Sequence, residues 1–124
     1  MKFAIAAAAT IFALPNAFAS APADLDAAVR AFFAKNGVNG VMEFADAAAG
    51  AKRALSLPAV PSNVYKAEKY YVLSYDAADA QAQKATLDVF VSGDAGEREV
   101  SLVYVSARPV VQEMIEKGRI QKVE

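Results

Sequence analysis

The chain has 124 residues, 56% of them hydrophobic, and its 13 basic and 14 acidic residues give a formal net charge of −1. This length suits one compact domain, and the near-neutral charge gives no electrostatic basis for binding nucleic acid. The sequence contains neither histidine nor cysteine. Nucleophile systems that need those residues are therefore excluded, as are the usual donor sets for zinc, haem and iron–sulfur clusters. We expect no cofactor and no metal.

The N-terminal segment is typical of an export signal. Lys2 precedes an uncharged apolar run, Phe3–Leu14, and Ala17–Ala19 places small residues where a signal peptidase cleaves. The run is shorter than the roughly 20 residues of a membrane-spanning helix, although an uncleaved anchor is the alternative. We expect a signal peptide over residues 1–19 and a single small α+β domain over residues 20–124. A cysteine-free exported domain points to a bacterial periplasmic or secreted protein with no stable membrane anchor after cleavage.

Two helices are predicted after the leader. Apolar residues from Leu25 to Phe33 recur at helical spacing and predict a helix over residues 22–35. Asn39 can cap a second, alanine-rich helix that runs to about Leu55, before the prolines that follow it. Residues 58–64 are expected to form an extended connector.

The hydrophobic period then changes from 3.6 to 2. Residues 69–75 predict a strand with Tyr71, Leu73 and Tyr75 on one face and Tyr70 and Val72 on the other. A polar loop or short helical turn is expected over residues 76–84.

Residues 85–92 and 97–106 predict a hairpin around the turn Gly93–Gly96. Closing it across those four residues would pair Val89 with Val100 and Leu87 with Leu102, which keeps apolar side chains together.

The C-terminal segment predicts a short helix. It would begin near Pro109 and stop at Gly118, and residues 119–124 would fray or add a brief edge strand. The expected fold class is therefore α+β, with two N-terminal helices, a three- to four-stranded mostly antiparallel sheet and a short C-terminal helix.

Acidic residues offer only weak candidates for chemistry. The loop acids lack the alternating oxygen ligands of a calcium site and are expected to be solvated; they are Asp76, Asp79, Asp94 and Glu97. Asp88 falls in the middle of a predicted strand, where we expect it on the wet face of the sheet. If a helix covered that face, Asp88 beside Tyr70 or Tyr104 could act as a buried proton shuttle.

Aromatic side chains are concentrated in the predicted strands, on both faces. The candidate binding residues are Tyr70, Tyr71, Tyr75, Phe90 and Tyr104. Tyrosine is enriched at protein interfaces, and apolar character on both faces requires a cover of some kind: a helix, a second copy of the chain or a partner.

The favoured hypothesis is thus an exported, non-catalytic protein that binds a protein partner, or itself as a homodimer, through a tyrosine-rich sheet surface. The alternative is a small enzyme or ligand carrier with a cavity between sheet and helices, using Asp88 and a tyrosine. The residues that we single out indicate no particular substrate.

Overall fold

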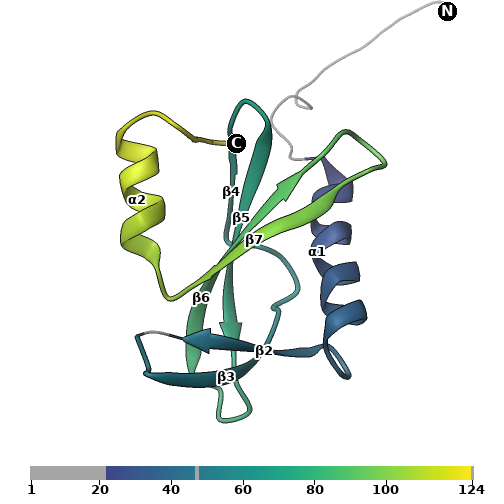
Figure 1. Cartoon of the computed structure of the whole chain (residues 1–124), viewed down its shortest axis with the longest axis vertical. Helices are drawn as coiled ribbons and strands as arrows, with labels where there is room; N and C mark the ends of the chain where they lie inside the picture. The colour runs from purple at the N-terminus through teal and green to yellow at the C-terminus, as the bar shows by residue number, and fades with distance from the viewer. Residues whose placement is uncertain (1–21, 47, 124) are drawn as a thin grey trace, which may run out of the picture.

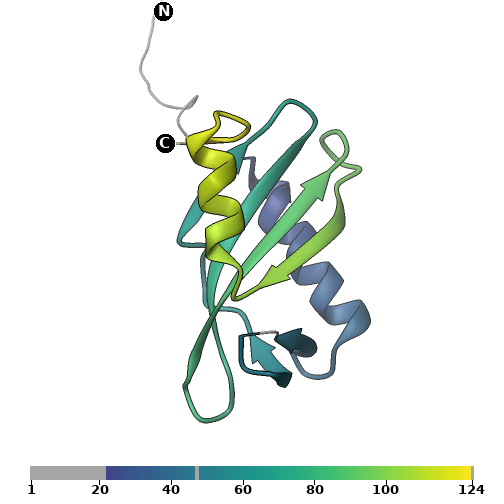
Figure 2. The same ribbon diagram turned by 60° about the vertical axis from the view of Figure 1, so that its left-hand side comes forward.

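The computed structural model describes residues 22–46 and 48–123. These residues form one antiparallel sheet with a helix on each of its faces (Figures 1 and 2). The elements are, in chain order, α1 (Ala23–Asn36), β2 (Val41–Asp46), β3 (Ala51–Ser56), β4 (Asn63–Lys66), β5 (Tyr70–Ala78), β6 (Lys84–Ser92), β7 (Glu99–Val105), α2 (Arg108–Glu116) and β8 (Gln121–Lys122). The expected signal peptide over residues 1–19 lies outside the described residues.

Strand β5 is the centre of the sheet. One of its edges pairs with β6 along the whole strand, from Tyr70 opposite Ser92 to Ala78 opposite Lys84. Its other edge is shared, because β4 pairs with residues 71–74 and β3 reaches only Ala78, through Ser56. The sheet then extends from β3 to β2, from β4 to β8 and from β6 to β7.

The two faces of β5 and β6 are buried under different helices. On the first face, α1 buries Leu25, Val29 and Phe33, which lie one turn apart on one stripe. They pack in a cluster that includes the odd-numbered core residues of the central strands, Leu73, Tyr75, Leu87, Val89 and Val91. On the second face, a smaller cluster joins Val111 of α2 and Ile120 to Tyr65, Val72 and Phe90.

The predicted second helix is wrong, because its residues form the β2–β3 hairpin. Asn39 and Gly40 both have positive φ, 54° and 79°, and the backbones of Val38 and Val41 exchange hydrogen bonds of 2.8 and 3.0 Å across them. Asn-Gly is the preferred pair for such a two-residue turn, since few other residues adopt positive φ twice in succession. Asn39 therefore reverses the chain instead of capping a helix.

The expected sheet of three to four strands is also wrong, because the described residues form seven. β2 and β3 account for two of the additional strands. β4 begins in the last two residues of the expected connector, 63 and 64, and continues to Lys66; β8 is the brief edge strand that the sequence left open. The first helix, the faces of residues 70–75 and the short C-terminal helix are confirmed.

The predicted register of the β6–β7 hairpin is wrong. Leu87 lies opposite Val105 and Val89 opposite Val103, and an irregularity between Phe90 and Val91 shifts the outer pairs. Leu102 therefore faces the α2 side, opposite Phe90. Because β7 has apolar residues at both alternating positions, either register would bury apolar side chains, and the sequence pattern alone does not distinguish them.

The start of α1 holds the turn between β6 and β7. The Asp24 carboxylate accepts hydrogen bonds from the backbone of Gly96, at 2.9 Å, and from Arg98, at 3.2 Å. Gly93 has a φ of 98°, and a Cβ there would come within 2.3 Å of the Glu97 carbonyl oxygen. These contacts favour a wider loop than the four-residue turn that the sequence predicts.

The β2–β3 hairpin is anchored to the rest of the sheet by Asp46, which is 2% exposed. Its carboxylate accepts hydrogen bonds from Ser106 at 3.1 Å and from Arg53 at 3.3 Å, and Arg53 also binds Asp79 at 3.0 Å. Burial alone would raise the pKa of Asp46, but the hydrogen bonds from Arg53, Ser106 and two backbone amides outweigh it and hold the pKa below its ordinary value.

Acid should therefore weaken the fold through this anchor. A carboxyl group whose pKa is lower in the folded chain stabilises it above the unfolded pKa of about 3.9, and the contribution disappears as pH falls through the lower folded value. We expect the free energy of unfolding in urea to fall steeply below about pH 4. Asp46→Asn should lower the free energy of unfolding at neutral pH and make its decrease below about pH 4 less steep.

Glu43→Gln, on the exposed side of the same strand, is the control for loss of a charge. If the free energy of unfolding fell as steeply at low pH in Asp46→Asn as in the unmodified chain, the role assigned to Asp46 would be contradicted.

Candidate functional site

The five predicted binding residues do not form one surface. Tyr71 and Tyr75 belong to the cluster under α1, whereas Tyr70, Phe90 and Tyr104 lie on the opposite face, with α2. The alternation along β5 causes this division, because successive side chains of a strand point to opposite faces.

The two tyrosines on the α1 face have structural partners. Tyr75 is 0% exposed, and its hydroxyl donates a 2.6 Å hydrogen bond to the Asp26 carboxylate. Burial, reinforced by that carboxylate, raises the pKa of Tyr75 far above its usual value. The Arg98 guanidinium lies 5.4 Å from the centre of the Tyr71 ring, in the range of a cation–π contact. Tyr75 therefore joins the helix to the sheet and does not offer a binding surface.

The other three residues form an aromatic row across β5, β6 and β7. The Tyr70 and Phe90 rings are stacked at 5.4 Å, and the Tyr104 ring meets Phe90 edge-on at 5.5 Å. Such pairs contribute about 0.5–1.5 kcal/mol beyond their buried area. Phe90 is only 8% exposed, so the row serves mainly as the floor of the second core.

A groove of ≈ 330 Å³ lies at the end of this row, between β7 and α2. It is lined by Phe90, Tyr104, Val110, Glu113, Met114, Lys117 and Arg119. Val110, and Leu102 on β7, are large apolar side chains left 43% and 44% exposed. Glu113 and Lys117 are paired with each other at 2.9 Å, so the rim of the groove is partly neutralised.

A larger groove borders β7 on the opposite face of the sheet. It has a volume of ≈ 580 Å³ and lies between the first half of β7 and α1, which run beside each other in Figures 1 and 2. We call it the α1–β7 groove; its walls are Ala28, Ala31, Phe32, Lys35, Asn36, Arg98, Glu99 and Val100. Its helical wall is mostly small or apolar, so the groove has room for side chains that approach β7 from outside.

The backbone edge between these two grooves is open. In the part of the chain that the structure describes, β7 pairs with β6 alone. Ser106 donates its backbone N–H to the Thr86 carbonyl at 2.8 Å, which fixes the alternation along the strand. Tyr104 therefore directs its backbone groups to β6, and Val103 directs its N–H and C=O outward.

Three strands of the described sheet, β2, β7 and β8, pair with one neighbour only, and they differ in how well their open edge is protected. β2 carries Glu43 and Asp46 within six residues, and β8 is only two residues long. β7 is seven residues long, and after Glu99 it contains no charge. Charges and short length are the usual protection against edge-to-edge pairing, so β7 is the least protected edge.

Asp88 is not on a wet face, because α2 covers it. The side chain is 0% exposed, and Ser74, 1% exposed, donates to its Oδ1 atom. Arg108, at the start of α2, also donates to Oδ1 at 2.8 Å and contacts the Tyr65 hydroxyl at 3.3 Å. Oδ2 of Asp88 has no hydrogen-bond partner among the described residues.

This polar cluster fixes α2 on the sheet. Arg108 reaches from the first turn of the helix to two adjacent strands, through Ser74 on β5 and Asp88 on β6. No hydrogen bond joins Asp88 to Tyr70 or Tyr104 among the described residues, and the grooves beside β7 are not lined by Asp88. The geometry therefore favours a structural role for Asp88 over the proton-shuttle alternative.

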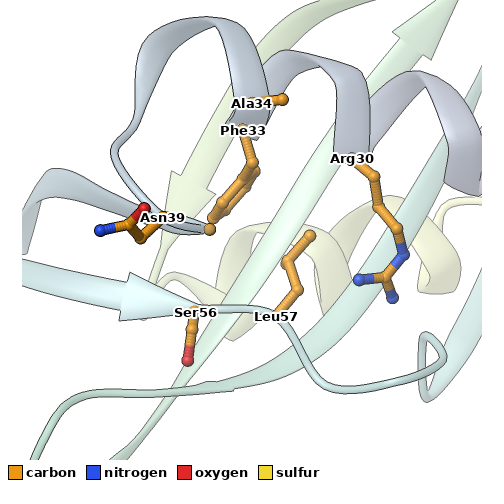
Figure 3. A pocket seen from close by; sticks show the side chains of 7 residues that line it. Arg30, Phe33, Ala34, Asn39, Ser56 and Leu57 are labelled. Carbon is orange, nitrogen blue, oxygen red and sulfur yellow. The ribbon is translucent and has the colours of Figure 1, made fainter.

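A third hollow, of ≈ 360 Å³, lies where the end of α1 meets the end of β3 (Figure 3). Phe33 and Leu57 point into it. Arg30 lies at its rim, where its Nε atom donates to Asp26 and its Nη2 atom donates to the carbonyl oxygens of Pro58 and Ala59.

The described residues show no cluster of three or more His, Cys, Asp or Glu side chains positioned for a metal ion. They also include no helix that is both long and apolar enough to cross a membrane. No family model, curated protein sequence or solved structure matches the chain.

Three features of these surfaces were missed by the sequence prediction. Leu102 was placed opposite Leu87 by the wrong register, and neither Val110 nor Arg108 was considered as part of a surface or a site. The position of Arg108 directly before the helix-starting Pro109 was the signal available, because that position points back to the preceding strand.

Breaking the Asp88–Arg108 pair should destabilise the fold. Arg108→Gln leaves a buried carboxylate without its cation, and we expect a loss of about 3 kcal/mol, the low end for buried pairs, because Arg108 is 35% exposed. Chemical denaturation of a double-mutant cycle with Asp88→Asn should show strong coupling.

Lys117→Gln breaks an exposed pair on the same helix and should cost about 0.5 kcal/mol or less. Additive effects of the Asp88 and Arg108 substitutions would show that the cluster does not hold α2.

Proposed function

We propose that the chain is an exported, non-catalytic protein that binds an extended polypeptide as an additional strand on the free edge of β7. The observation that supports this most strongly is the long, almost uncharged edge with a groove on each side. A strand added there would accept a hydrogen bond from the Val103 N–H, donate one to its carbonyl oxygen, and direct alternate side chains toward the two grooves.

The chemistry of the site defines the expected ligand. Ala28, Ala31 and Phe32 offer an apolar wall on one face, and Leu102 and Tyr104 offer apolar contacts on the other. The bound segment should therefore carry apolar residues on both faces near its centre, without proline at positions that must donate to β7. Of the five residues first selected from the sequence, Tyr104 is the one that lies on this edge strand.

Export is supported by the pattern of the leader: a basic start, an apolar run and small residues before the expected cleavage point. We expect the protein isolated from its native host to begin at Ser20, and intact-mass spectrometry can measure this directly. Material that still contained residues 1–19 would contradict both the cleavage and the periplasmic or secreted location.

Strand addition should be detectable with synthetic peptides. We expect an acetylated peptide that copies residues 98–107, or other peptides with alternating apolar residues, to bind in the micromolar range, whereas a scrambled peptide should not. Fluorescence anisotropy measures the affinity, and NMR shift changes should concentrate at β7.

Two exposed alanines of α1 provide a matched pair of variants. Ala31 lines the α1–β7 groove, and Ala34 lines the hollow at the other side of the helix. Ala31→Arg should weaken peptide binding at least about 10-fold, and Ala34→Arg should leave it within about 2-fold. Binding of no alternating peptide, or equal loss in both variants, would refute the proposed function.

A further inference from the structure

We infer that the strand that occupies this edge is β7 of a second copy, so that two chains join their sheets around a two-fold axis. This inference rests on the proposed strand-binding function and names its partner. It follows from the way in which β7 complements itself when it is placed antiparallel to a copy of itself.

The outward-facing backbone groups select the register. Val103 directs both its N–H and its C=O away from β6, so two copies of Val103 placed opposite each other can exchange two hydrogen bonds. The ladder irregularity lies between Val100 and Leu102. The regular part of the edge, Leu102–Val105, is therefore centred near Val103, which favours a short pairing about that residue.

The side chains agree with this register on the α2 face. With Val103 on the axis, Leu102 lies opposite Tyr104 of the second copy, and the contact occurs twice because of the symmetry. Leu102 is 44% exposed in the single chain, so the pairing would cover an apolar side chain that the fold leaves open. Cross-strand aromatic–aliphatic pairs of this kind stabilise sheets by about 0.2–1 kcal/mol each.

The opposite face provides a complementary contact. A two-fold axis perpendicular to the sheet keeps both α1 helices on the same side of the joined sheet. On that side, Val103 of the second copy would lie opposite Val103 and Val105 opposite Ser101, next to the end of the α1–β7 groove that Val100 lines.

The test measures self-association of the protein as its host processes it. Light scattering after size exclusion and sedimentation across about 1–500 µM should show a monomer–dimer equilibrium within that range. Leu102→Lys should raise the dissociation constant at least about 30-fold, because it removes the apolar contact and requires a charged side chain to lose water at the interface. Val60→Lys, at a 69% exposed position before β4, is the matched control and should change the constant less than about 2-fold.

A second readout locates the interface. Hydrogen exchange of the Val103 amide should slow as the protein concentration rises, and it should stay fast in Leu102→Lys. Thermal unfolding of dilute Leu102→Lys shows whether the variant keeps its fold. Ala31→Arg, which places a large side chain in the α1–β7 groove, should also raise the dissociation constant of the dimer.

The outcomes separate this inference from the proposed function. A chain that stays monomeric but binds alternating peptides at β7 overturns the second copy as occupant and leaves strand addition to a different polypeptide. A monomer that binds no such peptide overturns both. A dimer that forms equally well in Leu102→Lys overturns the β7 interface.

Discussion

The structure depends on one constraint: the β5–β6 pair is buried on both faces. Nine residues of each strand are in register, and every other strand attaches to this pair directly or through one neighbour. Antiparallel sheets commonly leave one face wet, but here α1 covers one side and α2 the other (Figure 2). Each helix therefore covers one face, together with Phe44 and Leu55 of the β2–β3 hairpin on the α1 side. With nine residues, α2 is too short to be stable without that packing.

Burial of both faces explains why a carboxylate lies in the second core. Asp88 and Ser74 sit opposite each other in the β5–β6 ladder, where the alternation would otherwise place apolar residues. A buried charge is costly unless a cation and hydrogen bonds compensate it, and Arg108 is placed to do so from the first turn of α2. The cluster adds little net stability over a well-packed apolar core, but it fixes where the last helix meets the sheet.

Much of the fold could be predicted where periodicity acts alone. The stripe of α1 and the two faces of β5 were correct, because each element shows one dominant spacing. The prediction for the alanine-rich segment after Asn39 was wrong, because alanine is compatible with a helix and also with the crowded side of a hairpin. The decisive signal was the Asn39-Gly40 pair, whose turn preference outweighs the helical propensity of the residues that follow.

The prediction of the β6–β7 register was wrong for a different reason. Residues 102–105 are all apolar, so either alternation can face a core, and the contacts of Asp24 with the hairpin tip set the register from outside the strand. Sequence pattern correctly indicated a surplus of aromatic residues on two faces. It did not indicate the edge of β7, since a free edge is a consequence of strand order and has no periodic signature.

The openness of that edge follows from the composition of α1. The helix buries its large residues, Leu25, Val29 and Phe33, over the central strands, and presents Ala28 and Ala31 on the side toward β7. A larger side chain at the exposed Ala31 would fill part of the groove and shield the backbone of β7, whereas Ala28 also packs against the core cluster. Alanine thus has two effects in this chain: after Asn39 it allowed a wrong helix prediction, and on α1 it leaves the space that an added strand needs.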